Sequence, residues 1–247
     1  MEFYQILRAG WLCSPGRLRP PRSFEALPIA EWYPPPMTTF VLITVTGLAI
    51  VLAAERRGLE GVQWIAKPVA SWGFVAAALS LGALDTPYGC WLLAGLALSF
   101  AGDVLLIPKK TTVAFLLGLA SFLLAHAAYT VAFLLRGPVD ATSFLIAFPL
   151  VALGLGVLKR LWPRLSPKFR VAVPLYMVAI TIMLVCAFAA TLPTGRPVAL
   201  WLGAALFYVS DLAVARNRFV APGFANRAWG LPAYYAGQLL LAWTLAG

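Results

Sequence analysis

Long apolar segments, each of about 17 to 24 residues, run through most of this chain and leave few folds open to it. A segment of this length crosses a bilayer as a helix, whereas a transmembrane strand needs only about ten residues of alternating polarity. Lipid offers the backbone no hydrogen-bond partner, so a spanning segment must be a helix or part of a closed barrel. The chain is 62% hydrophobic and only 11% charged, far from the roughly 25% charged residues of a soluble domain. We therefore expect an all-α, polytopic integral membrane protein.

Eight such segments are recognisable, and we expect a transmembrane helix at each. Proline and glycine mark most of the junctions between them. The expected spans are residues 38–54, 63–84, 89–107, 112–135, 141–158, 171–191, 198–215 and 229–246. Residues 37–247 are thus predicted to form one domain of about eight transmembrane helices.

The first 36 residues differ from the rest of the chain. They are rich in proline and arginine and contain no apolar run long enough to span a bilayer. We expect residues 1–36 to be an N-terminal tail that is either disordered or upstream of the true start. Met37 stands directly before the first span, and the sequence leaves open whether translation starts at Met1 or at Met37.

The net charge of +10 comes mostly from short loops between the apolar segments. In a soluble protein such a charge would suggest nucleic acid, but here it is typical of a topology signal, so we expect no nucleic-acid partner. The loops after the first, third, fifth and seventh spans hold most of the Lys and Arg, whereas those after the second, fourth and sixth hold only Arg136 and Arg196. The basic loops are therefore predicted to be cytoplasmic, in a cell (inner) membrane.

Two aspartates lie inside apolar segments. Asp103 lies in the run LALSFAGDVLL, and Asp211 takes the matching place when residues 92–106 are aligned with 200–214. An ionisable side chain within a membrane helix costs at least about 2.5 kcal/mol, so it is a candidate for function by default. The alternative is a structural ion pair near the membrane surface. We expect Asp103 and Asp211 to be catalytic, at one depth, within about two turns of the basic ends of their helices.

A second alignment extends this internal similarity. The stretch GLASFLLAH, residues 118–126, lines up with GLPAYYAGQ, residues 230–238, and pairs His126 with Gln238. The two matches together predict a possible four-plus-four pseudo-repeat, an arrangement that often places a site between its halves.

Further polar residues in or beside the spans are candidates for substrate binding, each with a simpler alternative. Lys67 either neutralises an acid or a lipid phosphate, or extends to the headgroup region. A lone histidine or tyrosine on an apolar helix is often just a hydrogen-bond partner for a neighbouring helix, and an asparagine at a helix end is often a cap. The predicted substrate-binding residues are Lys67, His126, Tyr129, Asn217, Tyr235 and Gln238.

Metal ions and cofactors have little support in the sequence. The chain has one histidine, and its three cysteines match no C-x-x-C spacing. We expect neither a metal site nor a cofactor.

Several motifs together resemble the YhhN-like family of eight-span membrane proteins. They are LALSFAGDVLL, FLLGLASFLLAHAAY, GAALFYVSDLAVARNRF and YYAGQ, and the resemblance covers about residues 38–246. Characterised members are lysoplasmalogenases, so the resemblance implies hydrolysis of the vinyl ether bond of a 1-alkenyl lysophospholipid, with an ethanolamine or a choline head group. The implied partners are a lysophospholipid substrate and the lipid bilayer. The sequence does not decide the oligomeric state.

The implied chemistry suits two acids. A vinyl ether is hydrolysed by protonation at carbon, which gives an oxocarbenium ion that water attacks. Two carboxylates in a site of low dielectric constant can supply a proton donor and a stabilising anion. Two other readings stay open: a proton-coupled transporter of small solutes or lipids, with the aspartates as a proton relay, and a lipid-binding scaffold without catalytic activity.

Overall fold

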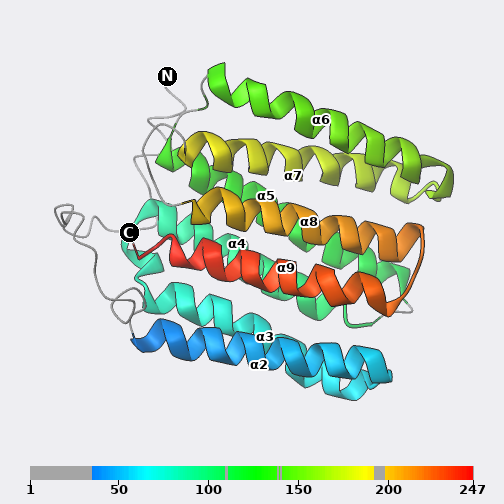
Figure 1. Ribbon diagram of the computed structural model, residues 1–247, viewed down its shortest axis with the longest axis horizontal. Coiled ribbons are helices and arrows are strands. Elements are labelled where there is room, and N and C mark those ends of the chain that lie inside the picture. Colours follow the sequence, from blue (N-terminus) through cyan, green and yellow to red (C-terminus); the bar gives the residue numbers. More distant parts are fainter. Residues whose placement is uncertain (1–34, 109–110, 138, 140, 192–197, 247) are drawn as a thin grey trace.

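The described part of the chain is entirely helical. The computed structural model describes residues 35–108, 111–137, 139, 141–191 and 198–246, and within these residues it contains eight α-helices and two short 3-10 turns. Five of the eight helices, α2, α4, α5, α7 and α8 in Figure 1, are long and apolar enough to cross a membrane. The expected all-α, polytopic membrane protein is confirmed. Residues 1–34 of the predicted N-terminal tail lie outside the described residues, and its last two residues, Pro35 and Pro36, begin α2.

The helices follow the predicted spans closely. Three ends differ by four residues or more. The second helix stops at Ser80 because Gly82 adopts a left-handed conformation (φ 77°), the seventh continues about one turn beyond its expected end, to Phe219, and the last begins at Phe224, five residues before its expected start. The bounds are α2 Pro35–Arg57, α3 Glu60–Ser80, α4 Pro87–Leu105, α5 Thr112–Arg136, α6 Ala141–Leu161, α7 Phe169–Thr191, α8 Ala199–Phe219 and α9 Phe224–Trp243.

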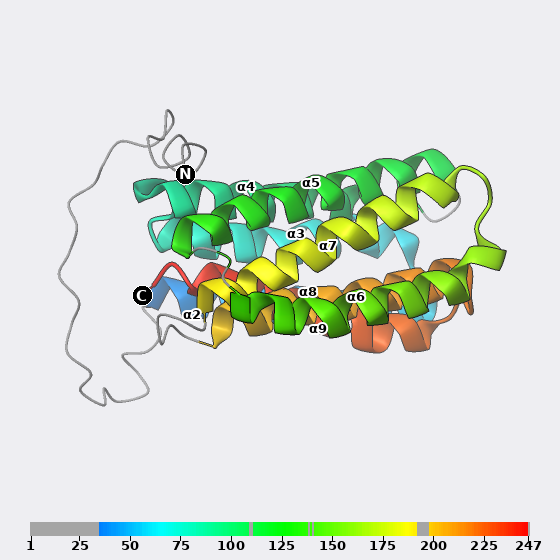
Figure 2. The ribbon, with the colours of Figure 1, turned by 90° about the horizontal axis from the view of Figure 1, so that it is seen from above.

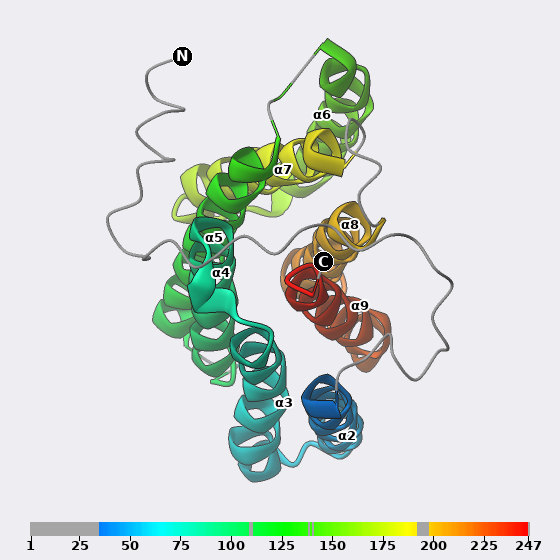
Figure 3. The same cartoon turned by 90° about the vertical axis from the view of Figure 1, so that its left-hand side faces the viewer.

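The helices lie side by side along one axis (Figure 1). Seen end on, α3, α4 and α5 form one layer and α2, α9 and α8 the other, with α7 and α6 at one edge (Figure 3). The view from above shows α7 crossing diagonally between the layers (Figure 2). Consecutive helices alternate in direction, so the chain brings the ends of α2, α4, α6 and α8 together with the starts of α3, α5, α7 and α9.

That end of the bundle, which we call the basic end, carries nearly all the described cations. Arg136 is at the opposite end, where its guanidinium donates to the Thr244 carbonyl. The cations of the basic end are Arg56, Arg57, Lys67, Lys159, Arg160, Arg164, Lys168, Arg170, Arg216, Arg218 and Arg227. The alternation expected from the loop charges is therefore present in the fold.

Small residues allow neighbouring helices to approach closely, both within a layer and between the layers. In α8 and α9, a Cβ atom added at Gly237 would lie 2.8 Å from the Gly203 carbonyl oxygen. In α2 and α3, the Thr44 hydroxyl donates to the Ala70 carbonyl at 3.1 Å beside Gly73. Such contacts replace the hydrophobic effect that lipid does not provide between membrane helices.

The Gly203–Gly237 contact can be tested by adding one methyl group. Gly237→Ala places a Cβ against backbone, so we expect a loss of stability of about 1 to 3 kcal/mol, the usual cost of overpacking. Gly156→Ala is the matched control, because nothing lies within 4 Å of a Cβ at that position of α6. Thermal unfolding in detergent micelles measures both. Equal stability of the two variants would contradict this account of the packing.

Candidate functional site

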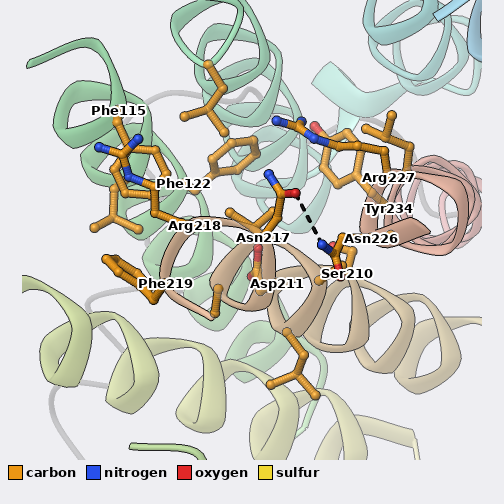
Figure 4. Close-up of a pocket in the computed structure, with 18 of the residues that line it drawn as sticks. Phe115, Phe122, Ser210, Asp211, Asn217, Arg218, Phe219, Asn226, Arg227 and Tyr234 are labelled. Carbon is orange, nitrogen blue, oxygen red and sulfur yellow. Dashed lines mark hydrogen bonds between the residues drawn. The ribbon is translucent and has the colours of Figure 1, made fainter. Parts of the chain in front are cut away.

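A cavity of about 470 Å³ opens at the basic end, between the two layers. Its volume is in the range of small-molecule sites, about 300 to 1,000 Å³. Most of its wall is apolar and comes from α4, α5, α7, α8 and α9, as the close-up in Figure 4 shows for part of it. The polar and charged lining residues are Glu55, Lys67, Asp103, Tyr176, Tyr208, Ser210, Asp211, Asn217, Arg218, Asn226, Arg227 and Tyr234.

Asp103 reaches this cavity near the end of α4 and is only 3% exposed. Its Oδ1 lies 3.1 Å from the Lys67 ammonium, which also donates to the Asp103 backbone carbonyl at 2.9 Å. Its Oδ2 accepts from the hydroxyls of Ser71 and Tyr234, each at 2.7 Å. A buried carboxylate with one cation and two hydroxyl donors is stable in its ionised form.

The helix geometry explains why these partners meet. Lys67 and Ser71 are four residues apart in α3 and therefore lie on the same face. Tyr234 comes from α9, and its neighbour Tyr235 lies within hydrogen-bonding distance of the Ser71 hydroxyl, at 3.2 Å. Three helices thus converge on one carboxylate.

Asp211, on α8, has quite different surroundings. The Tyr176 hydroxyl of α7 donates to its Oδ2 at 2.9 Å. Nε2 of His126, from α5, lies 3.4 Å from the same oxygen. Among the residues that the structure describes, neither a lysine nor an arginine forms an ion pair with Asp211.

The histidine ring is held in one orientation. Its Nδ1 lies 2.5 Å from the Phe122 backbone carbonyl, and the ring stacks on Phe207 with centroids 4.6 Å apart. A carbonyl oxygen only accepts hydrogen bonds, so Nδ1 carries a proton. In a neutral ring Nε2 then presents a lone pair to Asp211, and an ionised carboxylate there would repel it.

A single proton, either on Asp211 or on Nε2 of His126, removes this repulsion. A protonated Asp211 donates to Nε2, and a protonated imidazole donates to the carboxylate. In both cases the His126–Asp211 pair holds one proton; His126 is fully buried, and the Asp211 side chain is 15% exposed. Because Asp211 lines the cavity, this proton lies beside the cavity wall.

The two aspartates therefore line one cavity but differ in state. No hydrogen bond joins the two carboxylates within the described part of the chain. Their positions along their own helices also differ from the expected common depth. Asp103 is two residues, about 3 Å, from the end of α4, whereas Asp211 is eight residues, about 12 Å, from the end of α8.

The predicted substrate-binding residues divide into two groups. Lys67 and Asn217 line the cavity together with the two aspartates. Asn217 also fastens the α8–α9 turn, because its Oδ1 accepts from the Gly223 amide at 3.0 Å and from the Asn226 side chain at 3.2 Å. Contact of Lys67 and Asn217 with a substrate stays a prediction.

The other four lie behind the cavity wall. His126 and Tyr235 contact residues that surround the aspartates. Tyr129 donates to Gln238 Oε1 at 2.6 Å, and Gln238 lies 3.4 Å from the Ser99 hydroxyl. All four are at most 1% exposed, so they support the site from behind, and direct contact with a substrate stays a prediction for them as well.

Several residues of the site escaped the sequence analysis. Ser71 had a usable signal, its spacing of four from Lys67. Tyr176 and Tyr234 had only the weak signal of a hydroxyl within an apolar helix. Glu55 and Arg227 resembled ordinary loop charges, because nothing in the sequence shows that both turn into the cavity.

Metal ligands do not gather in this part of the protein. Across the residues with a described structure, no group of three His, Cys, Asp or Glu side chains is close enough to hold an ion.

Comparison with known proteins finds one matching family and several relatives. The model of the YhhN family matches residues 62–245. A protein of Mycobacterium tuberculosis named Lysoplasmalogenase is 32% identical over 213 residues, covering 81% of this chain and 77% of the relative. A Bos taurus protein named Lysoplasmalogenase TMEM86A is 33% identical over 177 residues, covering 69% and 71%. An Escherichia coli protein named Uncharacterized membrane protein YhhN is 26% identical over 195 residues, covering 78% and 91%. No solved structure matches the chain.

The buried Lys67–Asp103 pair predicts a specific pattern of stability. Lys67→Met leaves an unpaired buried carboxylate, so we expect a loss of about 3 to 5 kcal/mol. Adding Asp103→Asn to that variant removes the unpaired carboxylate charge and should restore most of the lost stability. Thermal unfolding of the single and double variants measures this. If the two changes are simply additive, the pair is not coupled as described.

Proposed function

This chain belongs to the YhhN family, and on that premise we propose that it hydrolyses the vinyl ether bond of lysoplasmalogens. Relatives named lysoplasmalogenase, at about a third identity over most of the chain, support a lysoplasmalogenase-like function. The observation that carries the proposal is a cavity lined by one buried and one partly buried aspartate, the first paired with a cation and the second 3.4 Å from a histidine nitrogen.

The proposed reaction has three steps. A proton adds to the vinyl carbon remote from oxygen, and the adjacent carbon becomes an oxocarbenium ion. Water then attacks that carbon, loses a proton and gives a hemiacetal, which collapses to a fatty aldehyde and a glycerophospho-base. The first proton is returned, so the net change is the addition of one water across the bond.

Asp211 suits the role of proton donor. It lines the cavity, and His126 behind it keeps one proton on the pair. After the water attacks, the same pair is free to take up the proton that is released. A positioned acid of this kind contributes about 10² to 10⁴ in rate.

Asp103 suits the role of stabilising anion. Its ion pair with Lys67 and its two hydroxyl donors keep it ionised, so it offers negative charge where the oxocarbenium ion develops. We thus assign the two catalytic aspartates different tasks.

The shape of the cavity fits a single-chain lipid. It opens at the basic end, and its wall is mostly apolar, so it suits a hydrocarbon chain beside a polar head. A proton relay for transport would instead need polar groups through the depth of the bundle. We propose that the basic end faces the cytoplasm and that the protein lies in the cell membrane, in line with the positive-inside rule.

The assay that tests this proposal is aldehyde release from a 1-alkenyl lysophospholipid by purified protein. Asp211→Asn and Asp103→Asn should each lose at least about a hundredfold in activity, the scale expected of a general acid or its electrostatic partner. Asp85→Asn is the matched control, because Asp85 lies in the turn between α3 and α4 at the opposite end. Folding of each variant is checked by thermal unfolding.

Two results would contradict the proposal. One is a folded wild-type protein that releases no aldehyde from either an ethanolamine or a choline substrate. The other is release that survives in a folded Asp211→Asn variant.

In this proposal His126 acts through Asp211, so its substitution should change kcat and KM to different extents. His126→Gln keeps a polar side chain but cannot share a proton in the same way, so we expect kcat to fall by about ten- to a hundredfold. KM should stay within about a factor of two, since His126 does not line the cavity. Steady-state kinetics in mixed micelles separate the two constants. A raised KM with an unchanged kcat would show a purely structural role.

A further inference from the structure

Two opposite charges meet in the cavity wall apart from the catalytic residues. Glu55 is near the end of α2 and Arg227 is in the first turns of α9. Arg227 Nη1 lies 3.9 Å from Glu55 Oε1, and the side chains are 23% and 10% exposed. Both line the cavity. Neither has a task in the reaction described above.

We propose that Glu55 and Arg227 form a binding site for a zwitterionic lipid head group. Arg227 binds the phosphate and Glu55 binds the ammonium. The site rests on the proposed function for the glycerol and the alkenyl chain of its ligand, and it adds the means by which the head group is recognised.

The phosphate is assigned to Arg227 by the positions of the other cations. Lys67 is already engaged by Asp103, through both its carboxylate and its backbone carbonyl. The Arg218 guanidinium stacks over the Phe115 ring at 4.4 Å. Figure 4 shows Arg218 and Arg227 on opposite sides of Asn217. Arg227 faces the cavity with a planar fork of N–H donors, which matches a phosphate.

The ammonium is assigned to Glu55 by charge. Oε1 of Glu55 already faces a cation across 3.9 Å, a long ion pair that gains little energy from direct hydrogen bonds. A head group that enters beside the pair brings one charge of each sign. The phosphate then faces Arg227 and the ammonium faces Glu55, and the net charge of the cavity wall is unchanged.

The location also fits the reaction. Lys67 lies within electrostatic range of both Glu55 and Arg227 and contacts Asp103 directly. In a lysoplasmalogen the phosphate and the vinyl ether oxygen are attached to opposite ends of a three-carbon glycerol. A head group held by Arg227 therefore places the vinyl ether farther into the same cavity, toward the aspartates.

The experiment measures binding of lipids that cannot be hydrolysed. The probes are saturated 1-alkyl ether lysolipids with two head groups: glycerophosphoethanolamine, which has an ammonium, and glycerophosphate, which has none. Native mass spectrometry or tryptophan fluorescence gives Kd for each. Glu55→Gln should weaken binding of the ethanolamine lipid by about tenfold or more and change that of the phosphate lipid by less than about threefold. Arg227→Gln should weaken both.

Matched controls and a neutral pair complete the design. Glu60→Gln and Arg170→Gln change exposed charges at the same end of the bundle and should leave both Kd values unchanged. The double variant Glu55→Gln/Arg227→Gln removes both charges and leaves neither of them unpaired. It can therefore be tested for binding even where a single variant folds poorly. It should bind both lipids weakly.

The outcomes separate this site from the proposed reaction. The head-group site is overturned if Glu55→Gln affects the two lipids alike, if neither single variant changes Kd, or if wild type binds neither lipid. The expected binding pattern in a protein that releases no aldehyde would leave the site standing and reject the reaction. Aldehyde release without that binding pattern would reject the head-group site and leave the proposed reaction standing.

Discussion

A charge in a medium of low dielectric constant must be paired or neutralised, and the site is built around that requirement. Asp103 meets it through Lys67, Ser71 and Tyr234, which come from two other helices. Breaking this group would strand a charge worth several kcal/mol. The contacts fix α3 and α9 against α4 beside the cavity. The ion pair thus connects the packing of the bundle with the position of its reactive groups.

The second acid meets the same requirement by another route. Asp211 has no cationic side chain of its own in the described structure, and it shares a proton with His126 instead. The two acids of the cavity thus have different partners, and we propose that one acts as an anion and the other as a proton donor. This difference is what acid-catalysed opening of a vinyl ether requires, and it arises from the partners of each residue rather than from the residues themselves.

Much of this architecture is visible in the sequence. Apolar segments of spanning length and the charges between them give eight helices and their alternation, and the cost of a buried charge singles out Asp103 and Asp211. What the sequence could not give is contact between distant helices. α8 was expected to end at residue 215, and its extra turn to Phe219 places Asp211 deeper than expected. His126 was expected to bind substrate or to bond a neighbouring helix, and nothing in the sequence shows that it faces Asp211. Tyr176 and Tyr234 were missed because the sequence does not show which residue a hydroxyl in an apolar helix will contact.

The most direct test of the central claim follows a solvent deuteron. Purified protein acts on a 1-alkenyl lysophospholipid in D₂O, and the aldehyde is trapped by reduction before its position is read by mass spectrometry. If the cavity acid protonates carbon, the aldehyde carries one deuterium on the carbon next to its carbonyl. The rate at which labelled aldehyde forms should fall in the Asp211→Asn and His126→Gln variants. In H₂¹⁸O the new oxygen should lie in the aldehyde, so ¹⁸O found in the glycerophospho-base instead would show that the bond on the glycerol side is broken and would contradict the roles assigned to the two aspartates.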